Sequence, residues 1–230
     1  MVLMQKLAQF DAKAVAFLHA YRIAWLLELL GADYQVQVIE RDPNSKLAPE
    51  SLCDIHPLGK SPLIQDDNVI IAESGAICEY LLAKYDTQGQ FQLAPDHAEY
   101  WAYRQWLHYA EGSLMPLLVM SLIFRKIDDT HKPFFAKPIA QKITDGFRNS
   151  FLNPQTKLHL DYVEQQLNHK TWLIGEKITA ADMMMSFPLQ AACKRLPSVN
   201  YPNITAYVAR IEAEPHYQQA EQKLGKLGIL

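Results

Sequence analysis

The chain has 230 residues, of which 49% are hydrophobic and 20% are charged. This composition is typical of a globular protein that buries a sizeable core, and it excludes an intrinsically disordered chain. With 22 basic and 25 acidic residues the net charge is −3, so the chain lacks the basic surface of a nucleic-acid-binding protein.

Cysteine usage and apolar runs bear on the cellular compartment. The three cysteines, Cys53, Cys78 and Cys193, form no Cys-x-x-Cys pair, so neither a dithiol redox motif nor a zinc site is predicted. Sparse cysteines in odd number fit a reducing compartment. Residues 1–10 do not resemble a signal peptide, and no apolar stretch approaches the length of a membrane span. We therefore expect a cytoplasmic protein with no metal ion and no membrane or nucleic-acid partner.

The N-terminal residues 1–30 carry the apolar spacing of a helix. Apolar side chains recur every three or four residues, at Leu3, Leu7, Phe10, Ala14, Phe17 and Tyr21. No Gly, Pro or Asn interrupts this stretch, so local signals predict one long helix. The sheet of an α/β domain would instead require a strand within the first twenty residues, and the sequence leaves both alternatives open. Gly31 is a helix stop, and the alternation of residues 34–38 then predicts a strand.

A hairpin and a helix are predicted next, after a polar loop over residues 41–50. Residues 62–64 and 69–71 are apolar runs separated by a polar turn, which predicts a β-hairpin. Ser74 precedes an amphipathic stretch that ends at Tyr85, and we expect its side chain to cap that helix.

The chain becomes polar between residues 87 and 95, where Gly89 and Pro95 predict a linker. Every later segment carries a helical pattern. We therefore expect a small α/β domain over residues 1–87, followed by an all-helical domain over residues 96–230.

A helix in the second half has a distinct start signal. Residues 179–182 read Thr-Ala-Ala-Asp, the pattern of a capping box, and they begin a helix over residues 180–194. This helix is apolar nearly all round and is expected to be buried, with a kink at Pro188.

Four short segments carry a more specific signal. Residues 56–63 read His-Pro-Leu-Gly-Lys-Ser-Pro-Leu, residues 73–77 read Glu-Ser-Gly-Ala-Ile, and residues 111–116 read Glu-Gly-Ser-Leu-Met-Pro. Residues 181–189 begin Ala-Asp and end Ser-Phe-Pro-Leu. In this order and spacing the segments resemble those of cytosolic glutathione transferases of the fungal and bacterial serine-type class. The resemblance implies a thioredoxin-like α/β N-terminal domain followed by an all-helical C-terminal domain.

The resemblance also implies a glutathione site. It implies a cis peptide bond before Pro62, with the backbone of Ser61 pairing with the cysteinyl part of glutathione; otherwise about 5–6% of X–Pro bonds are cis. It further implies that the γ-glutamyl carboxylate binds at Ser74 and the γ-glutamyl ammonium group at Glu73. Lys60 then favours the glycyl carboxylate by charge.

Physical chemistry supports part of this assignment and offers simpler alternatives. A serine at a helix N-terminus presents a hydroxyl, free N–H groups and a positive dipole end to a carboxylate. Lys46 is a second candidate for the glycyl carboxylate. Without the resemblance, Ser74 would be only a helix cap, Glu73 an exposed acid and Lys60 a solvated charge.

The segment expected to activate the glutathione sulfur departs from the family pattern. Catalysis requires a hydrogen-bond donor that lowers the thiol pKa, because the thiolate is the nucleophile. In the resembling class this donor is a serine, but the matching position here is Leu18, which has no side-chain donor. His19 and Tyr21 are the nearest replacements, and Tyr21 is the candidate.

Three functions remain open at this stage. One is a glutathione transferase that conjugates the glutathione thiolate to small apolar electrophiles in detoxification, with glutathione as co-substrate and no further cofactor. The others are a non-catalytic glutathione-transferase-like ligand-binding protein and a purely structural or interaction subunit. The family implies a homodimer. Aromatic residues at helical spacing over residues 100–109 are either core or a lining for the electrophile.

Overall fold

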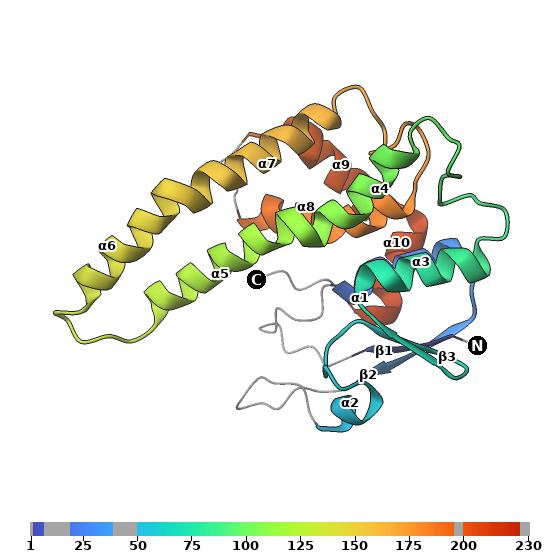
Figure 1. The fold of residues 1–230 in the computed structure, drawn as a ribbon, viewed down its shortest axis with the longest axis horizontal. Helices are drawn as coiled ribbons and strands as arrows, with labels where there is room; N and C mark the ends of the chain where they lie inside the picture. The colour runs from blue at the N-terminus through green and yellow to red at the C-terminus, as the bar shows by residue number, and fades with distance from the viewer. Residues whose placement is uncertain (1, 7–18, 39–49, 196–199, 226–230) are drawn as a thin grey trace.

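The computed structural model describes residues 2–6, 19–38, 50–195 and 200–225 (Figure 1). The predicted loop over residues 41–50 lies outside them except for its last residue. The first part contains β1 (Val2–Lys6), α1 (His19–Leu29), β2 (Tyr34–Val38), α2 (Glu50–Ile55), β3 (Leu63–Asp66), β4 (Val69–Ala72) and α3 (Ser74–Tyr85). The second contains α4 (Tyr100–Tyr109), α5 (Met115–Asp129), α6 (Lys137–Phe147), α7 (Asn153–Gln166), α8 (Ala180–Arg195), α9 (Pro202–Ala213) and α10 (Pro215–Leu224).

The sheet has the strand order β2-β1-β3-β4. Strand β1 pairs in parallel with β2 and antiparallel with β3. The prediction of one continuous helix over residues 1–30 is therefore wrong, because Val2–Lys6 is a strand. Ladder bonds to strands distant in sequence decide this conformation, and the local apolar spacing contains no information about those partners.

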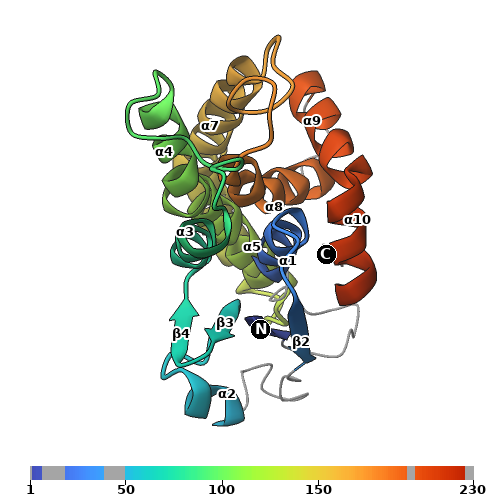
Figure 2. The same cartoon turned by 90° about the vertical axis from the view of Figure 1, so that its right-hand side faces the viewer.

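The predicted hairpin and the helix after it are confirmed. Strands β3 and β4 pair antiparallel, and Asp67, with φ of 53°, lies in the turn between them. One detail of the prediction is wrong: Ser74 is the first helical residue of α3, and the cap position belongs to Glu73. The positive φ of Glu73, 73°, sets the direction in which the helix leaves the sheet. Figure 2 shows α3 and α1 on the same side of the sheet, facing the all-helical part.

Helix α8 forms the centre of the all-helical part, as predicted. Every residue from Ala180 to Ala192 is buried, and the helix runs through Pro188. The Asp182 carboxylate accepts hydrogen bonds from the Thr179 N–H at 2.8 Å and hydroxyl at 3.1 Å, which confirms half of the capping box. It also accepts from the Leu173 N–H and the Tyr207 hydroxyl, both at 2.9 Å. This buried carboxylate therefore ties α8 to α9 and to the loop before α8.

Helices α5 and α6, with their connection, form an arm that projects to the left in Figure 1. Two π-helical turns adjoin these helices: η2 (Ala110–Leu114) lies between α4 and α5, and η3 (Arg148–Leu152) lies between α6 and α7. The continuous run Tyr100–Asp129 is long and apolar enough to cross a membrane by length and composition alone, a test that core helices of soluble proteins also pass. Its first half packs on α8 in this fold.

Candidate glutathione site

The hairpin brings the two halves of the predicted site together. Leu63 of β3 pairs with Ala72 of β4 at the end of the hairpin. The next residues, Pro62 and Glu73, therefore lie next to each other just beyond the last strand pair. Neighbouring strands lie about 4.8 Å apart. The segments around Ser61 and Ser74, separated by twelve residues in sequence, are thereby placed at one end of the sheet.

The first half of the site has the conformation that the resemblance implied. The Ser61–Pro62 peptide bond is cis. The Ser61 hydroxyl oxygen is buried and has no hydrogen-bond partner within the described residues. Gly59 is buried with φ of 53°, a conformation that favours glycine, and its N–H donates to the His56 carbonyl at 2.8 Å. The backbone turn that positions Ser61 is therefore held from the side of α2.

The second half is the N-terminus of α3. Ser74 is only 3% exposed, yet no hydrogen bond to its hydroxyl occurs within the part of the chain that the structure describes. The Glu73 side chain is exposed and makes no capping bond to the helix. The helix therefore presents free backbone N–H groups, a hydroxyl and a positive dipole end, which together favour a carboxylate.

The remaining predicted binding residues are less well defined. Lys60 is exposed beside Gly59 and has no carboxylate partner among the described residues. Its ammonium group is thus available to an anionic ligand at the same end of the sheet. Lys46 and Leu18 both lie outside the described residues, so their predicted roles stay predictions.

Tyr21, the candidate replacement for the sulfur-activating serine, is buried at 3% exposure. Its hydroxyl donates to the Gly225 carbonyl at 2.5 Å, which ties α1 to the end of α10. Burial raises the pKa of this phenol, and the nearby Tyr217 and Glu221 raise it further. The phenol is therefore protonated at neutral pH, and its proton is engaged with the protein backbone.

Sequence reasoning missed the charged pair that joins the two parts of the fold. Arg22 of α1 is fully buried, and its guanidinium donates to the Glu111 carboxylate of η2 at 2.5 Å. It also lies against Met184 of α8 and over the Phe187 ring. The signal in the sequence is one arginine within an otherwise apolar stretch, because a charge on a buried helix face needs a partner.

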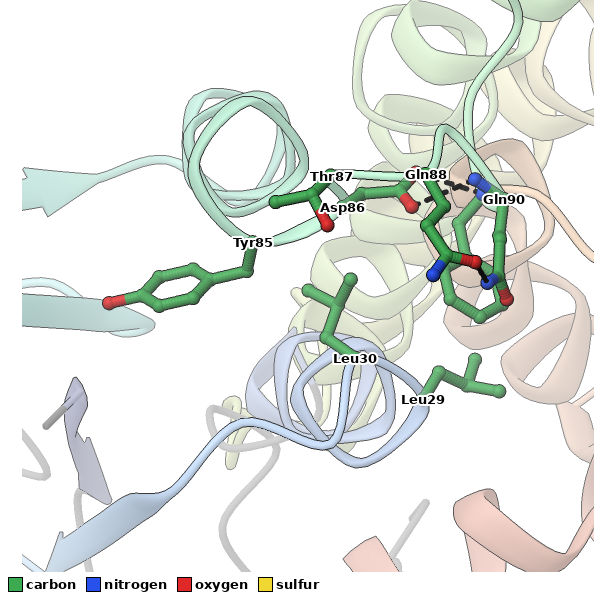
Figure 3. A pocket seen from close by; sticks show the side chains of 8 residues that line it. Leu29, Leu30, Tyr85, Asp86, Thr87, Gln88 and Gln90 are labelled. Carbon is green, nitrogen blue, oxygen red and sulfur yellow. Dashed lines mark hydrogen bonds between the residues drawn. The ribbon is translucent and has the colours of Figure 1, made fainter.

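Two cavities lie at the opposite end of α3 from Ser74. Figure 3 shows the smaller, of about 160 Å³, between the ends of α1 and α3 and the linker, with Tyr85, Thr87 and Gln88 on its wall. The larger, of about 930 Å³, follows the linker toward Trp172. A helix of the length of α3 spans about 18 Å. These cavities are therefore separate from the Ser61–Ser74 site.

Most aromatic residues of α4 pack against the rest of the fold, although Trp101 is exposed. Tyr103 and Trp106 are buried, and the Trp106 ring stacks on Tyr162 of α7 with centroids 5.5 Å apart. Tyr109 lies within hydrogen-bond distance of His159 at 2.5 Å. Within the described residues, no group of three His, Cys, Asp or Glu side chains is arranged to hold a metal ion.

Comparison with known proteins gives the same family for both halves of the chain. Residues 14–83 match the glutathione S-transferase N-terminal domain, and residues 151–215 match its C-terminal domain. Glutathione S-transferase 1 of Saccharomyces cerevisiae is 34% identical over 91% of this chain and 92% of its own length. Glutathione S-transferase 3 of Schizosaccharomyces pombe is 34% identical over 88% of this chain and 83% of its own length.

Solved structures agree in fold. A glutathione S-transferase from Actinobacillus pleuropneumoniae has a TM-score of 0.76 and 33% identity, covering 98% of this chain and 94% of that one. A glutathione transferase from Phanerochaete chrysosporium, solved with oxidized glutathione, has a TM-score of 0.72 at 19% identity, covering 97% and 94%. The architecture is that of a thioredoxin-like domain joined to an all-helical domain.

The chain belongs to the glutathione S-transferase family. The two yeast relatives are named glutathione S-transferases, and their similarity to this chain covers most of each protein. This supports a glutathione S-transferase function. Nothing in these comparisons favours the non-catalytic alternative left open by Leu18.

Proposed function

We propose that this chain is a glutathione transferase that conjugates the glutathione thiolate to small apolar electrophiles. The observation that carries the proposal is the position of Ser61, whose buried hydroxyl has no partner among the described residues, beside the α3 N-terminus at Glu73 and Ser74, which has no side-chain cap. To bind an extended tripeptide with a carboxylate at each end, a protein needs an exposed backbone segment that can hydrogen-bond to the middle residue. It also needs a positively charged or positively polarised group near each carboxylate. This site offers that arrangement.

In the proposed complex, the backbone of Ser61 pairs with the cysteinyl unit beside Pro62. The γ-glutamyl carboxylate accepts hydrogen bonds from the Ser74 hydroxyl and the α3 N–H groups. The ammonium group of the same γ-glutamyl residue pairs with the Glu73 carboxylate. Lys60 neutralises the glycyl carboxylate. No further cofactor is required, because glutathione itself is the co-substrate.

The chemical step is displacement or addition at carbon. The thiolate sulfur forms a bond to the electrophilic carbon, and with an aryl halide the carbon–halogen bond breaks and the halide leaves with its electron pair. The protein contributes by binding the thiolate form and lowering the thiol pKa. Because the Tyr21 proton is already donated to Gly225, we assign Tyr21 to packing, which leaves His19 as the other candidate sulfur donor that the sequence offers.

Turnover separates the enzyme from the binding protein. With reduced glutathione and an aryl halide, we expect product formation above the uncatalysed rate, saturating with glutathione. A rate equal to the uncatalysed one, together with retention on immobilised glutathione, would establish the non-catalytic alternative. Absence of both turnover and retention would leave only the structural role.

We further propose that two copies associate, with the α/β part of one on the all-helical part of the other. Apolar side chains are exposed on both: Val69 and Ile70 on β4, and Phe151 and Leu158 around α7. In sedimentation velocity we expect a dimer for the native chain and a monomer for Ile70→Asp, with Trp101→Ser, an exposed residue of α4, still dimeric. A native chain that sediments only as monomer contradicts this proposal.

The domain boundaries at residues 1–87 and 96–230 and a cytoplasmic, detoxifying role complete the proposal. They are supported by the position of the strands before Tyr85, the helices after Tyr100, and the sparse free cysteines.

A further inference from the structure

The end of the α5–α6 arm exposes two adjacent aromatic side chains. Phe134 is 89% exposed and Phe135 is 64% exposed, with ring centroids 5.7 Å apart. Ile139 and Ile143 of α6 continue the apolar surface toward the body, at 62% and 67% exposed. Scattered exposed apolar residues are ordinary, but a contiguous cluster of this kind marks an interaction site. We call residues 125–143 the tip.

The tip is a hydrogen-bonded structure that holds the two rings outward. The Thr130 N–H donates to the Lys126 carbonyl at 3.0 Å, and the Ala136 N–H donates to the Pro133 carbonyl at 2.9 Å. The Lys132 ammonium group closes the end of α5 by donating to the carbonyls of Ile127, Asp128 and Thr130. The apolar cluster is therefore presented by an ordered turn (Figure 1).

The tip also differs in charge from the rest of the chain. It contains five basic and two acidic residues, a net charge of +3, so the remaining residues carry −6 of the chain's total of −3. Asp128, one of the two acids, is held by Arg148 and the Thr144 hydroxyl. Lys126, Lys137 and Lys142 are exposed and have no carboxylate partner among the described residues.

We propose that the tip is a docking surface for an anionic lipid bilayer, into whose interface Phe134 and Phe135 insert. An apolar end surrounded by lysines is the pattern that binds at the headgroup level, because aromatic rings enter the acyl boundary while ammonium groups meet anionic headgroups. The lysine stems extend along the apolar surface and place their charges at the bilayer surface. The expectation of no membrane partner rested on the lack of an apolar stretch long enough to span a bilayer, and a peripheral contact of this kind needs no such stretch.

Charge disfavours a tip-to-tip contact between two copies, whereas it favours an anionic bilayer. Two tips facing each other would bring like net charges of +3 together, which is unfavourable. The dimer surfaces proposed above, at Ile70 and Leu158, also lie outside the tip. The lipid proposal does not depend on catalysis, so the two can fail separately.

The test is co-sedimentation of the full chain with vesicles of phosphatidylcholine, with and without an equal share of phosphatidylglycerol. We expect binding to the anionic vesicles that weakens with added salt. The double variant Phe134→Ser, Phe135→Ser should bind at least about tenfold more weakly. Lys126→Gln with Lys137→Gln should lose about tenfold on anionic vesicles only. Trp101→Ser, which removes an exposed aromatic ring elsewhere, should bind like the native chain.

Thermal unfolding of each variant shows whether it is folded. Because the substituted residues are exposed, we expect the unfolding temperature of each variant to equal that of the native chain. No binding by the native chain overturns the proposal, as does equal binding by the double phenylalanine variant. A third outcome also overturns the proposal: the native chain does not bind vesicles, and the double phenylalanine variant sediments as a monomer. The tip would then be a contact surface for a second copy of the chain.

Discussion

Replacing Asp182 by Ala is expected to destabilise the chain by at least about 3 kcal/mol. The carboxylate is fully buried and accepts hydrogen bonds from two backbone N–H groups and two hydroxyls. Alanine leaves all four donors buried without an acceptor. Leaving a buried donor unsatisfied costs more free energy than an intact hydrogen bond contributes to stability. Urea unfolding monitored by far-ultraviolet circular dichroism measures the change.

The control is Asp129→Ala, which removes an exposed acid at the end of α5 and should change the unfolding free energy by less than about 0.5 kcal/mol. Asp182→Asn should fall between the two, because its amide keeps one acceptor oxygen but directs N–H donors at other donors. An Asp182→Ala midpoint close to that of Asp129→Ala would show that the carboxylate does not hold α8 in place.

Ser74→Ala is expected to weaken glutathione binding by about tenfold to a hundredfold, the worth of a hydrogen bond to a charged group. Because the Ser74 hydroxyl has no hydrogen bond within the described chain, its removal should leave the unfolding free energy nearly unchanged. Isothermal titration calorimetry with reduced glutathione measures the affinity. Glu73→Gln should weaken binding in the same direction, through the γ-glutamyl ammonium group.

Ser121→Ala, a serine of α5 remote from the hairpin, provides the matched control and should bind glutathione like the native chain. If Ser74→Ala also binds like the native chain, the α3 N-terminus does not hold the ligand. If instead Ser74→Ala unfolds easily, the hydroxyl is a structural cap, the simpler role that the sequence left open.

Much of the fold was predictable because its signals are local. The β3–β4 hairpin follows from two apolar runs around a polar turn, and the burial of α8 follows from its apolar sides. Strand β1 was not predictable in this way, since its helical apolar spacing conflicts with pairing to strands far along the chain. The π-helical turns at residues 110–114 and 148–152 also leave no local pattern, because an extra residue in one turn is decided by packing.

The candidate site was predictable only through the family resemblance. The cis bond at Pro62 and the pairing of Ser61 with the α3 N-terminus depend on register across the hairpin, which residue types alone do not specify. The cap assignment failed because the positive φ of Glu73 moves the start of α3 by one residue. Glu111 lies within a matched segment, but its pairing with Arg22 joins residues 89 apart in sequence.

The most direct test of the central claim is a crystal structure of the chain grown with saturating reduced glutathione. We predict the γ-glutamyl carboxylate at the Ser74 hydroxyl and the α3 N–H groups, the ammonium group at Glu73, and the cysteinyl backbone paired with Ser61 beside the cis bond to Pro62. Glutathione bound elsewhere, or this site empty at saturating ligand, would contradict the account.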